Sequence, residues 1–136
     1  MTRLLLAYAG ALVVFCALDY LWLGHVAKAF YQAQVGPLLL ARPNWGAAAL
    51  LYIAYPAAIV FFATLPSLAT ASVAHALWTG ALLGLVVYGT YELTNLATLK
   101  GWTLGVAIVD ALWGAVVTAA AAGGGHLLAR LAGPAG

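Results

Sequence analysis

The chain has 136 residues, of which 66% are hydrophobic and only 6% are charged, and its formal net charge is +2. Soluble domains carry about a quarter charged residues, so this composition predicts a chain surrounded by lipid, with residues 1–136 forming one membrane domain. The basic residues are scattered and form no stripe that would neutralise phosphates, which argues against nucleic-acid binding. The single cysteine, Cys16, excludes an internal disulfide and a multi-cysteine metal site.

Four apolar stretches are long enough to cross a bilayer core of about 30 Å, which needs about 20 helical residues. They cover residues 4–24, 45–65, 72–99 and 103–122. Pro66 is expected to end the second stretch, and the glycines at 123–125 are expected to loosen the chain after the fourth. Continuous apolar runs favour helices over barrel strands, so the sequence predicts an all-α, integral membrane four-helix bundle with both chain ends on one side.

The connection between the first two spans, residues 25–44, is longer than the others and mixed in polarity. Apolar residues recur in it at helical spacing: Val26, Ala29, Phe30 and Ala33. This pattern predicts a short helix lying in the membrane interface and ending at Gly36-Pro37. A cover over one end of the bundle and a simple connector are both open interpretations, and the connector is the simpler one.

Small residues and aromatic residues predict how the helices pack. Two glycine pairs have the spacing that allows close helix contacts: Gly80 with Gly84, and Gly101 with Gly105. Helical spacing continues the Gly80 face through Tyr88, Tyr91 and Asn95, so this face is expected to point into the bundle. Pro56 predicts a kink in the second span. Four tryptophans near span ends are typical of aromatic belts: Trp22, Trp45, Trp78 and Trp102.

All three carboxylates lie inside predicted spans: Asp19, Glu92 and Asp110. The first and third helices end on the side where the fourth begins, so the three acids occupy the same half of the bilayer. A charge in lipid costs about 2.5–3.5 kcal/mol at a helix centre, and three would cost about 7–10 kcal/mol. We therefore expect them to point inward and gather. If Glu92 and Asp110 meet, they should share a proton and titrate as a coupled pair.

These residues predict a polar pocket inside the membrane. Its polar side is expected to come from Asp19, Glu92, Asn95 and Asp110, and its aromatic sides from Trp22, Trp113, Tyr52, Tyr55 and Tyr91. Whether the chain is an enzyme is open; if it is, the three acids Glu92, Asp110 and Asp19 would carry out general acid–base chemistry. The simpler alternative is that polar residues only join helices, at about 0.6 kcal/mol per hydrogen bond.

Two short motifs remain. Asp19-x-x-Trp22 and Asp110-x-x-Trp113 repeat one pattern, which places an acid and an indole on adjoining turns of one helix face. His75 and His126, near the opposite end of the spans, are expected to be solvated rather than metal or haem ligands. Without a histidine pair at ligand spacing or a glycine-rich phosphate loop, we predict neither a metal nor a cofactor.

The segment from Tyr88 to Trp102 (YGTYELTNLATLKGW) is the most specific part of the sequence. Together with DALWG at 110–114 and DYLWLG at 19–24, it resembles the bacterial membrane family called domain of unknown function 2177, over the whole chain. In that family Asp tends to stand where this chain has Glu92, and Pro where it has Thr103. The resemblance implies a four-helix protein of the bacterial inner membrane without assigned activity, often encoded near lipid-modifying enzymes.

Three functions are compatible with these features. The first is binding or processing of a small amphiphilic or lipid-like molecule in the pocket, for example by isomerisation or proton transfer. The second is a proton-coupled carrier of small molecules, acting as a homo-oligomer, although polar residues are few in the half that holds the chain ends. The third is an accessory subunit that packs through its Gly80/Gly84 face against a larger membrane complex. Membrane lipids are expected partners in each case.

Overall fold

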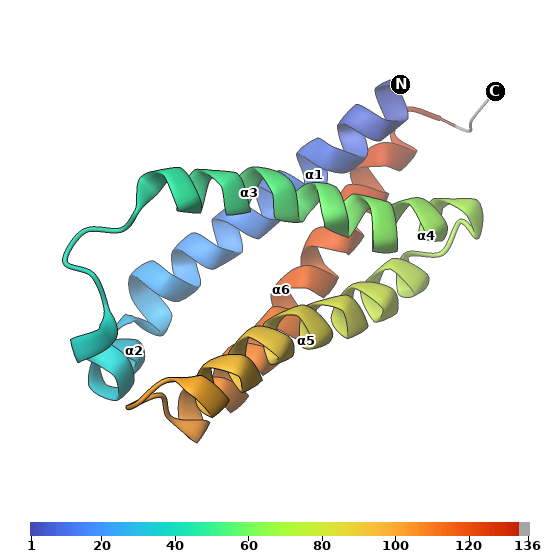
Figure 1. The fold of residues 1–136 in the computed structure, drawn as a ribbon. Coiled ribbons are helices and arrows are strands. Elements are labelled where there is room, and N and C mark those ends of the chain that lie inside the picture. Colours follow the sequence, from blue (N-terminus) through green and yellow to red (C-terminus); the bar gives the residue numbers. More distant parts are fainter. Residues whose placement is uncertain (134–136) are drawn as a thin grey trace.

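The computed structural model describes residues 1–133 and consists, over that range, of helices joined by short turns. Four helical segments are long and apolar enough to cross a membrane: Thr2–Val26, Trp45–Ala69, Val73–Thr98 and Leu104–Arg130. Helix α6 (Leu104–Arg130) is central, because it packs along both α1 (Thr2–Leu21) and α5 (Val73–Thr98). The start of α1 and the end of α6 lie at the same end of the bundle (Figure 1). The predicted four-helix membrane fold is confirmed.

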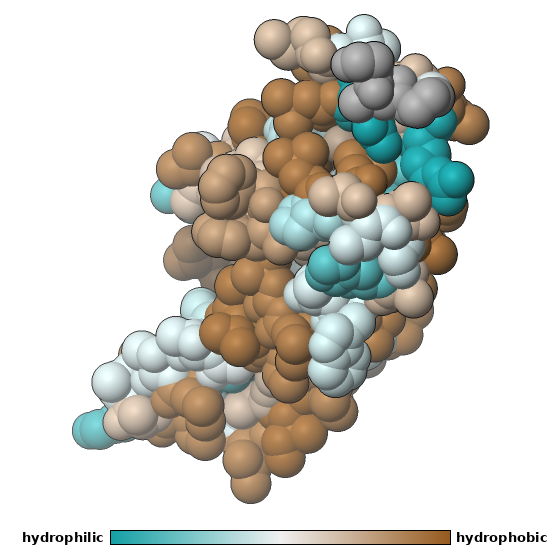
Figure 2. All heavy atoms as spheres, turned by 90° about the vertical axis from the view of Figure 1, so that its right-hand side faces the viewer, coloured by the Kyte–Doolittle hydropathy of each residue, from teal (hydrophilic) through white to brown (hydrophobic). Residues whose placement is uncertain are grey.

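Most of the molecular surface is apolar, as expected for a chain surrounded by lipid. Large hydrophobic side chains are exposed on all four spanning segments, among them Val13, Leu50, Val86 and Leu112. Figure 2 shows this for one face, where hydrophobic atoms predominate and hydrophilic ones gather in limited patches. Many of the buried positions hold small or polar residues, and a few large apolar side chains such as Phe15 and Ile59 complete the core, whereas most large apolar residues point outward.

The second span is longer than predicted, because Pro66 does not end it. The helix passes Pro56 inside α3 (Trp45–Ile59), widens into the π-helical turn η3 (Val60–Thr64) and continues as α4 (Leu65–Ala69). Proline has no N–H to donate, and a π turn changes the hydrogen-bond register just before Pro66. The helix thus continues through Pro66 to Ala69 instead of ending there.

The fourth span also extends beyond its predicted end. The glycines at 123–125 do not loosen the chain; they lie inside α6, where Gly124 and Gly125 pack against α1 and Gly123 packs against Leu77 of α5. A Cβ on Gly10 would lie 2.6 Å from the carbonyl oxygen of Gly124. The glycines are retained because the backbones touch, and tertiary packing compensates for their low helix propensity.

The contact between α5 and α6 is the second close crossing. Gly80 and Gly84 are buried against α6, as predicted, and a Cβ on Gly84 would lie 2.0 Å from the carbonyl oxygen of Gly114. The predicted partner pair is wrong: Gly101 lies in the turn before α6 with φ +83°, and Gly105 is exposed. The glycine of α6 that contacts Gly84 is instead Gly114, which lies one helical turn after Asp110 and faces α5.

Three of the spanning segments begin at side-chain caps. Asn44 accepts a hydrogen bond from the Ala47 N–H (3.1 Å), Ser72 from the His75 N–H (3.2 Å), and Thr103 from the Val106 N–H (3.2 Å). Such caps satisfy backbone donors that have no partner within the helix. Thr103 therefore starts α6 by capping it.

A line of buried polar contacts joins α6 to the second span in the half that holds the chain ends. The pairs are Tyr55 with Thr118 (2.8 Å), Thr64 with the Ala122 carbonyl (3.3 Å), and Ser67 with the His126 Nδ1 (2.7 Å). His126 is fully buried, so the expectation that it is solvated is wrong. Because α6 continues through its glycines, His126 stays inside the bundle and faces Ser67.

Helix α2 (Lys28–Val35) lies between the first two spans and covers one end of the bundle (Figure 1). It follows the π-helical turn η1 (Trp22–Val26) and ends, as predicted, where a 3-10 turn (η2, Gly36–Leu38) begins. The orientation of the helix differs from expectation. The predicted apolar face points outward, with Val26, Ala29 and Ala33 exposed, whereas Tyr31 and Val35 face the bundle. Apolar side chains can face lipid at no cost, so the helix can direct the face that carries Tyr31 toward the interior of the bundle.

Candidate intramembrane site

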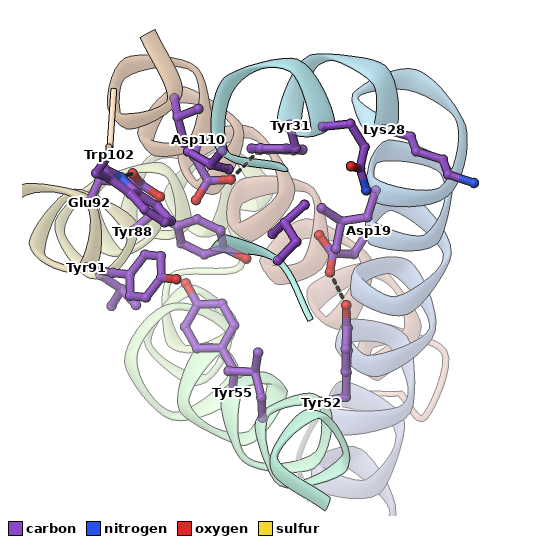
Figure 3. A pocket seen from close by; sticks show the side chains of 17 residues that line it. Asp19, Lys28, Tyr31, Tyr52, Tyr55, Tyr88, Tyr91, Glu92, Trp102 and Asp110 are labelled. Atoms are coloured by element: carbon purple, nitrogen blue, oxygen red, sulfur yellow. Dashed lines mark hydrogen bonds between the residues drawn. The ribbon is translucent and has the colours of Figure 1, made fainter. Parts of the chain in front are cut away.

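A cavity of about 700 Å³ lies between the spans in the half covered by α2. It is lined by residues of α1, α2, α3, α5 and α6, among which Asp19, Glu92 and Asp110 are the only acidic residues of the chain. Figure 3 shows the three carboxyl groups around the cavity together with tyrosines from several helices. The structure thus brings the three acids together at one interior place.

Asp19, near the end of α1, is 6% exposed. Its Oδ2 accepts a hydrogen bond from the Tyr52 hydroxyl of α3, and its Oδ1 accepts one from the Trp113 indole N–H of α6 (3.2 Å). Asp19 therefore joins three spans. Both donors are neutral groups, and they hold the carboxyl group in place.

Glu92 of α5 is the most deeply buried acid, with 2% exposure. Its Oε2 accepts a hydrogen bond from the indole N–H of Trp102 (2.7 Å), which lies in the turn between α5 and α6. Its carboxyl group faces the same cavity as the carboxyl group of Asp110 (Figure 3). The two acids meet at one cavity, as expected, and the proton that they would share stays a prediction.

Asp110 of α6 is partly buried and accepts a hydrogen bond from α2. The Tyr31 hydroxyl donates to Oδ1 at 2.5 Å and accepts a hydrogen bond from the Trp22 indole N–H at 3.1 Å. Burial, reinforced by the bond to Asp110, raises the pKa of the Tyr31 phenol. The hydroxyl therefore remains a protonated donor at neutral pH, and it attaches α2 to α6.

The repeated Asp-x-x-Trp motif forms a reciprocal arrangement between α1 and α6. Trp113 of the second motif donates directly to Asp19 of the first, and Trp22 of the first reaches Asp110 of the second through Tyr31. The two indoles stack with ring centroids 4.4 Å apart and an interplanar angle of 4°. Because the two helices run in opposite directions, the same motif on each can serve the other.

The predicted site residues divide into three groups. Those that line the cavity are Asp19, Glu92, Asp110, Tyr52, Tyr55 and Tyr91. Trp22 and Trp113 do not line it but lie behind its surface, where they hold the acids through hydrogen bonds. Asn95 is outside the set of lining residues, because it lies one turn nearer the end of α5 than Glu92.

Sequence reasoning missed three aromatic residues that line the cavity: Tyr31, Tyr88 and Trp102. Tyr88 was expected on an inward face but not in the pocket, and Trp102 was interpreted as an interface anchor. Tyr31 lies in the connection of mixed polarity between the first two spans, where no cavity residue was predicted. The lining residues Lys28, Tyr31, Gln32 and Val35 have the spacing of one helix face, so testing the polar face of that connector would have found it.

The fold and the site define an integral membrane four-helix bundle with an interior carboxyl cluster. A family model described as "Predicted membrane protein (DUF2177)" matches residues 4–127, and the chain belongs to this family. The resemblance drawn from the segment 88–102 is thereby confirmed. Searches of curated proteins and of solved structures found no match to the chain.

Proposed function

We propose that this protein binds a small amphiphilic molecule in the cavity between its spans, within the bacterial inner membrane. The observation that carries the proposal is that all three acids of the chain line one cavity of about 700 Å³. Cavities of a few hundred to about 1,000 Å³, mostly apolar and with a few convergent polar groups, are typical of small-molecule sites. Acids that only joined helices would not need to surround a space.

The shape of the site supports a ligand that arrives from the lipid. Leu51 of α3 and Val87 and Tyr91 of α5 line the cavity and are also exposed on the outside of the bundle. The first half of α3 diverges from α5 in Figure 1, while α5 packs against η3 and α4. An apolar tail between α3 and α5 would thus remain in the hydrocarbon while its head group reaches the acids.

The carboxyl pair also supports proton transfer to or from a bound ligand. Glu92 and Asp110 line one cavity, and if the two acids share a proton, one can donate it while the other accepts one. Trp102 and Tyr31 hold the two groups from opposite sides. An isomerisation or another proton-transfer reaction on the ligand would need no group beyond these.

A cavity-filling substitution tests the binding function. In phosphatidylcholine nanodiscs, dodecanol should bind the unaltered protein, and Leu51→Trp should lower its affinity about tenfold or more because the indole occupies the cavity. Leu50→Trp is the matched control, since Leu50 is exposed, neighbours Leu51 on the same helix and does not line the cavity. Titration calorimetry corrected with empty nanodiscs measures both. Equal affinities for the two variants would contradict the proposal.

A proton-coupled carrier is the second candidate, and a specific observation favours it. The buried contacts of Thr118, Thr64 and His126 continue a polar line through the half of the bundle opposite the cavity. The sequence offered few polar residues there, yet the structure aligns them on one seam. Ligand-driven proton movement across vesicles containing the protein would distinguish a carrier from a binding protein.

A further inference from the structure

The carboxyl groups at the cavity have no positively charged partner among residues 1–133 of the chain. Four side-chain hydrogen bonds reach them, from Tyr31, Tyr52, Trp102 and Trp113. All four donors are neutral phenols or indoles.

The basic residues on this side of the membrane do not supply the missing charge. Lys28 lies at the rim of the cavity, and Figure 3 shows its amine pointing away from the acids. Arg42 and Lys100 are exposed and do not line the cavity. Leaving carboxylates uncompensated in a largely apolar setting is costly, so a cation from outside the chain would be stabilised here.

Apart from Lys28 and Gln32 of α2, the remaining polar side chains of the cavity are aromatic. Tyr52, Tyr55, Tyr88, Tyr91 and Trp102 line it from three directions. Aromatic faces attract ammonium groups through their negative quadrupole, and groups of such rings are a recurrent way of recognising quaternary ammonium ligands. An anionic head group would instead face like charge and ring faces. The carboxyl groups and the rings therefore favour the same sign of ligand charge.

We propose that the ligand of this cavity is a cationic amphiphile, with an ammonium head between the acids and the aromatic rings and an apolar tail between α3 and α5. The inference rests on the proposed binding function and adds the charge of the head group to it. Lys28 at the rim would remain outside the head-group position. The chain's own cations are kept away from the acids, so the ligand completes the charge balance.

A set of amphiphiles with one tail and different heads tests this inference. Dodecyltrimethylammonium, dodecanol and dodecyl sulfate are titrated below their micelle concentrations into the full chain in phosphatidylcholine nanodiscs, with empty nanodiscs subtracted. The trimethylammonium compound should bind about tenfold or more tightly than the other two. Asp19→Asn and Asp110→Asn should each reduce that preference about tenfold, because they keep the side-chain shape and remove a charge. Lys100→Gln, which alters a charge outside the cavity, should leave it unchanged.

The outcomes separate the two proposals. Equal binding of the three compounds, blocked by Leu51→Trp, would overturn the cationic ligand and leave the binding function intact. Tightest binding of the sulfate would overturn it in the same way. Binding of none of the three would overturn both. If an Asn variant fails to fold, the head-group preference of the unaltered protein still decides the inference.

Discussion

At the scale of single residues, the site depends on pairing each acid with an aromatic donor. Indole and phenol groups have an apolar body and one polar tip, so they can bury a carboxyl group without introducing a second charge. Trp102 does this for Glu92, Tyr31 for Asp110, and Tyr52 with Trp113 for Asp19. This explains how acids reach 2% and 6% exposure in a chain with few cations.

Removing one such donor should destabilise the protein. Trp102→Phe keeps an aromatic ring but leaves the Glu92 oxygen without its N–H, so we expect the free energy of unfolding to fall by about 1–3 kcal/mol. Trp78→Phe is the control, because Trp78 is exposed and lies outside the cavity; its effect should stay within about 0.5 kcal/mol. Reversible denaturation in mixed detergent micelles measures both. A loss of equal size in the two variants would mean that the indole N–H contributes little.

At the scale of helices, two close crossings position the site. The backbone contact between Gly84 and Gly114 sets the distance between α5 and α6. It therefore also limits how far apart Glu92 and Asp110 can lie, farther along the same two helices. The backbone contact between Gly10 and Gly124 likewise sets the distance between α1 and α6. Since Gly80 and Gly84 are buried inside the chain, this face is not free to dock on another subunit, which removes the surface assigned to an accessory role.

Substitution at the crossing should separate α5 from α6. Gly84→Ala would place a methyl group 2.0 Å from a backbone oxygen, so we expect a loss of stability of about 1–3 kcal/mol from overpacking. Gly89→Ala on the same helix is the matched control, because a Cβ there meets nothing within 4 Å. The control should be neutral or stabilising by up to about 1 kcal/mol through helix propensity. Thermal unfolding in detergent compares them, and equal stability of the two variants would refute the role of the crossing.

At the scale of the whole molecule, α2 turns an open end of the bundle into one side of the cavity. It is attached through Tyr31, which bonds both Trp22 and Asp110, and through Gln34, which accepts a hydrogen bond from Thr103 (2.7 Å). The interpretation of this segment as a simple connector is therefore incomplete. The helix contributes Lys28, Tyr31 and Gln32 to the lining.

Loss of the Tyr31 hydroxyl should loosen α2 from the bundle. Tyr31→Phe removes both hydrogen bonds, so amide hydrogen exchange across Lys28–Val35 should become faster while exchange in α5 is unchanged. Because the pKa of this phenol is raised by burial, the unaltered protein should keep its protection from neutral to mildly alkaline pH. Tyr20→Phe is the control, as Tyr20 is exposed. Unchanged exchange in Tyr31→Phe would show that α2 is held by other contacts.

The sequence alone was sufficient to predict the membrane fold and the gathering of the acids. Both follow from one energetic fact, that hydrocarbon accepts apolar side chains and rejects carboxylates. Asp19, Glu92 and Asp110 could therefore be placed in one half of the bilayer by counting residues and following chain direction. The pairing of Gly80 and Gly84 with a neighbouring helix was predictable for a similar reason, since close backbone approach requires small residues.

Only the tertiary structure decided which donors meet the acids and which helix crossings form. Tyr31 and Trp102 lie outside the spanning segments, and whether they turn toward lipid, water or a carboxyl group depends on how α2 and the turn before α6 fold back. Pro66 and the glycines at 123–125 appeared to be helix ends because local propensity disfavours them, yet a π turn and a close crossing keep both inside helices. Local preference is worth about 1–3 kcal/mol at such positions, and packing over a whole span outweighs it.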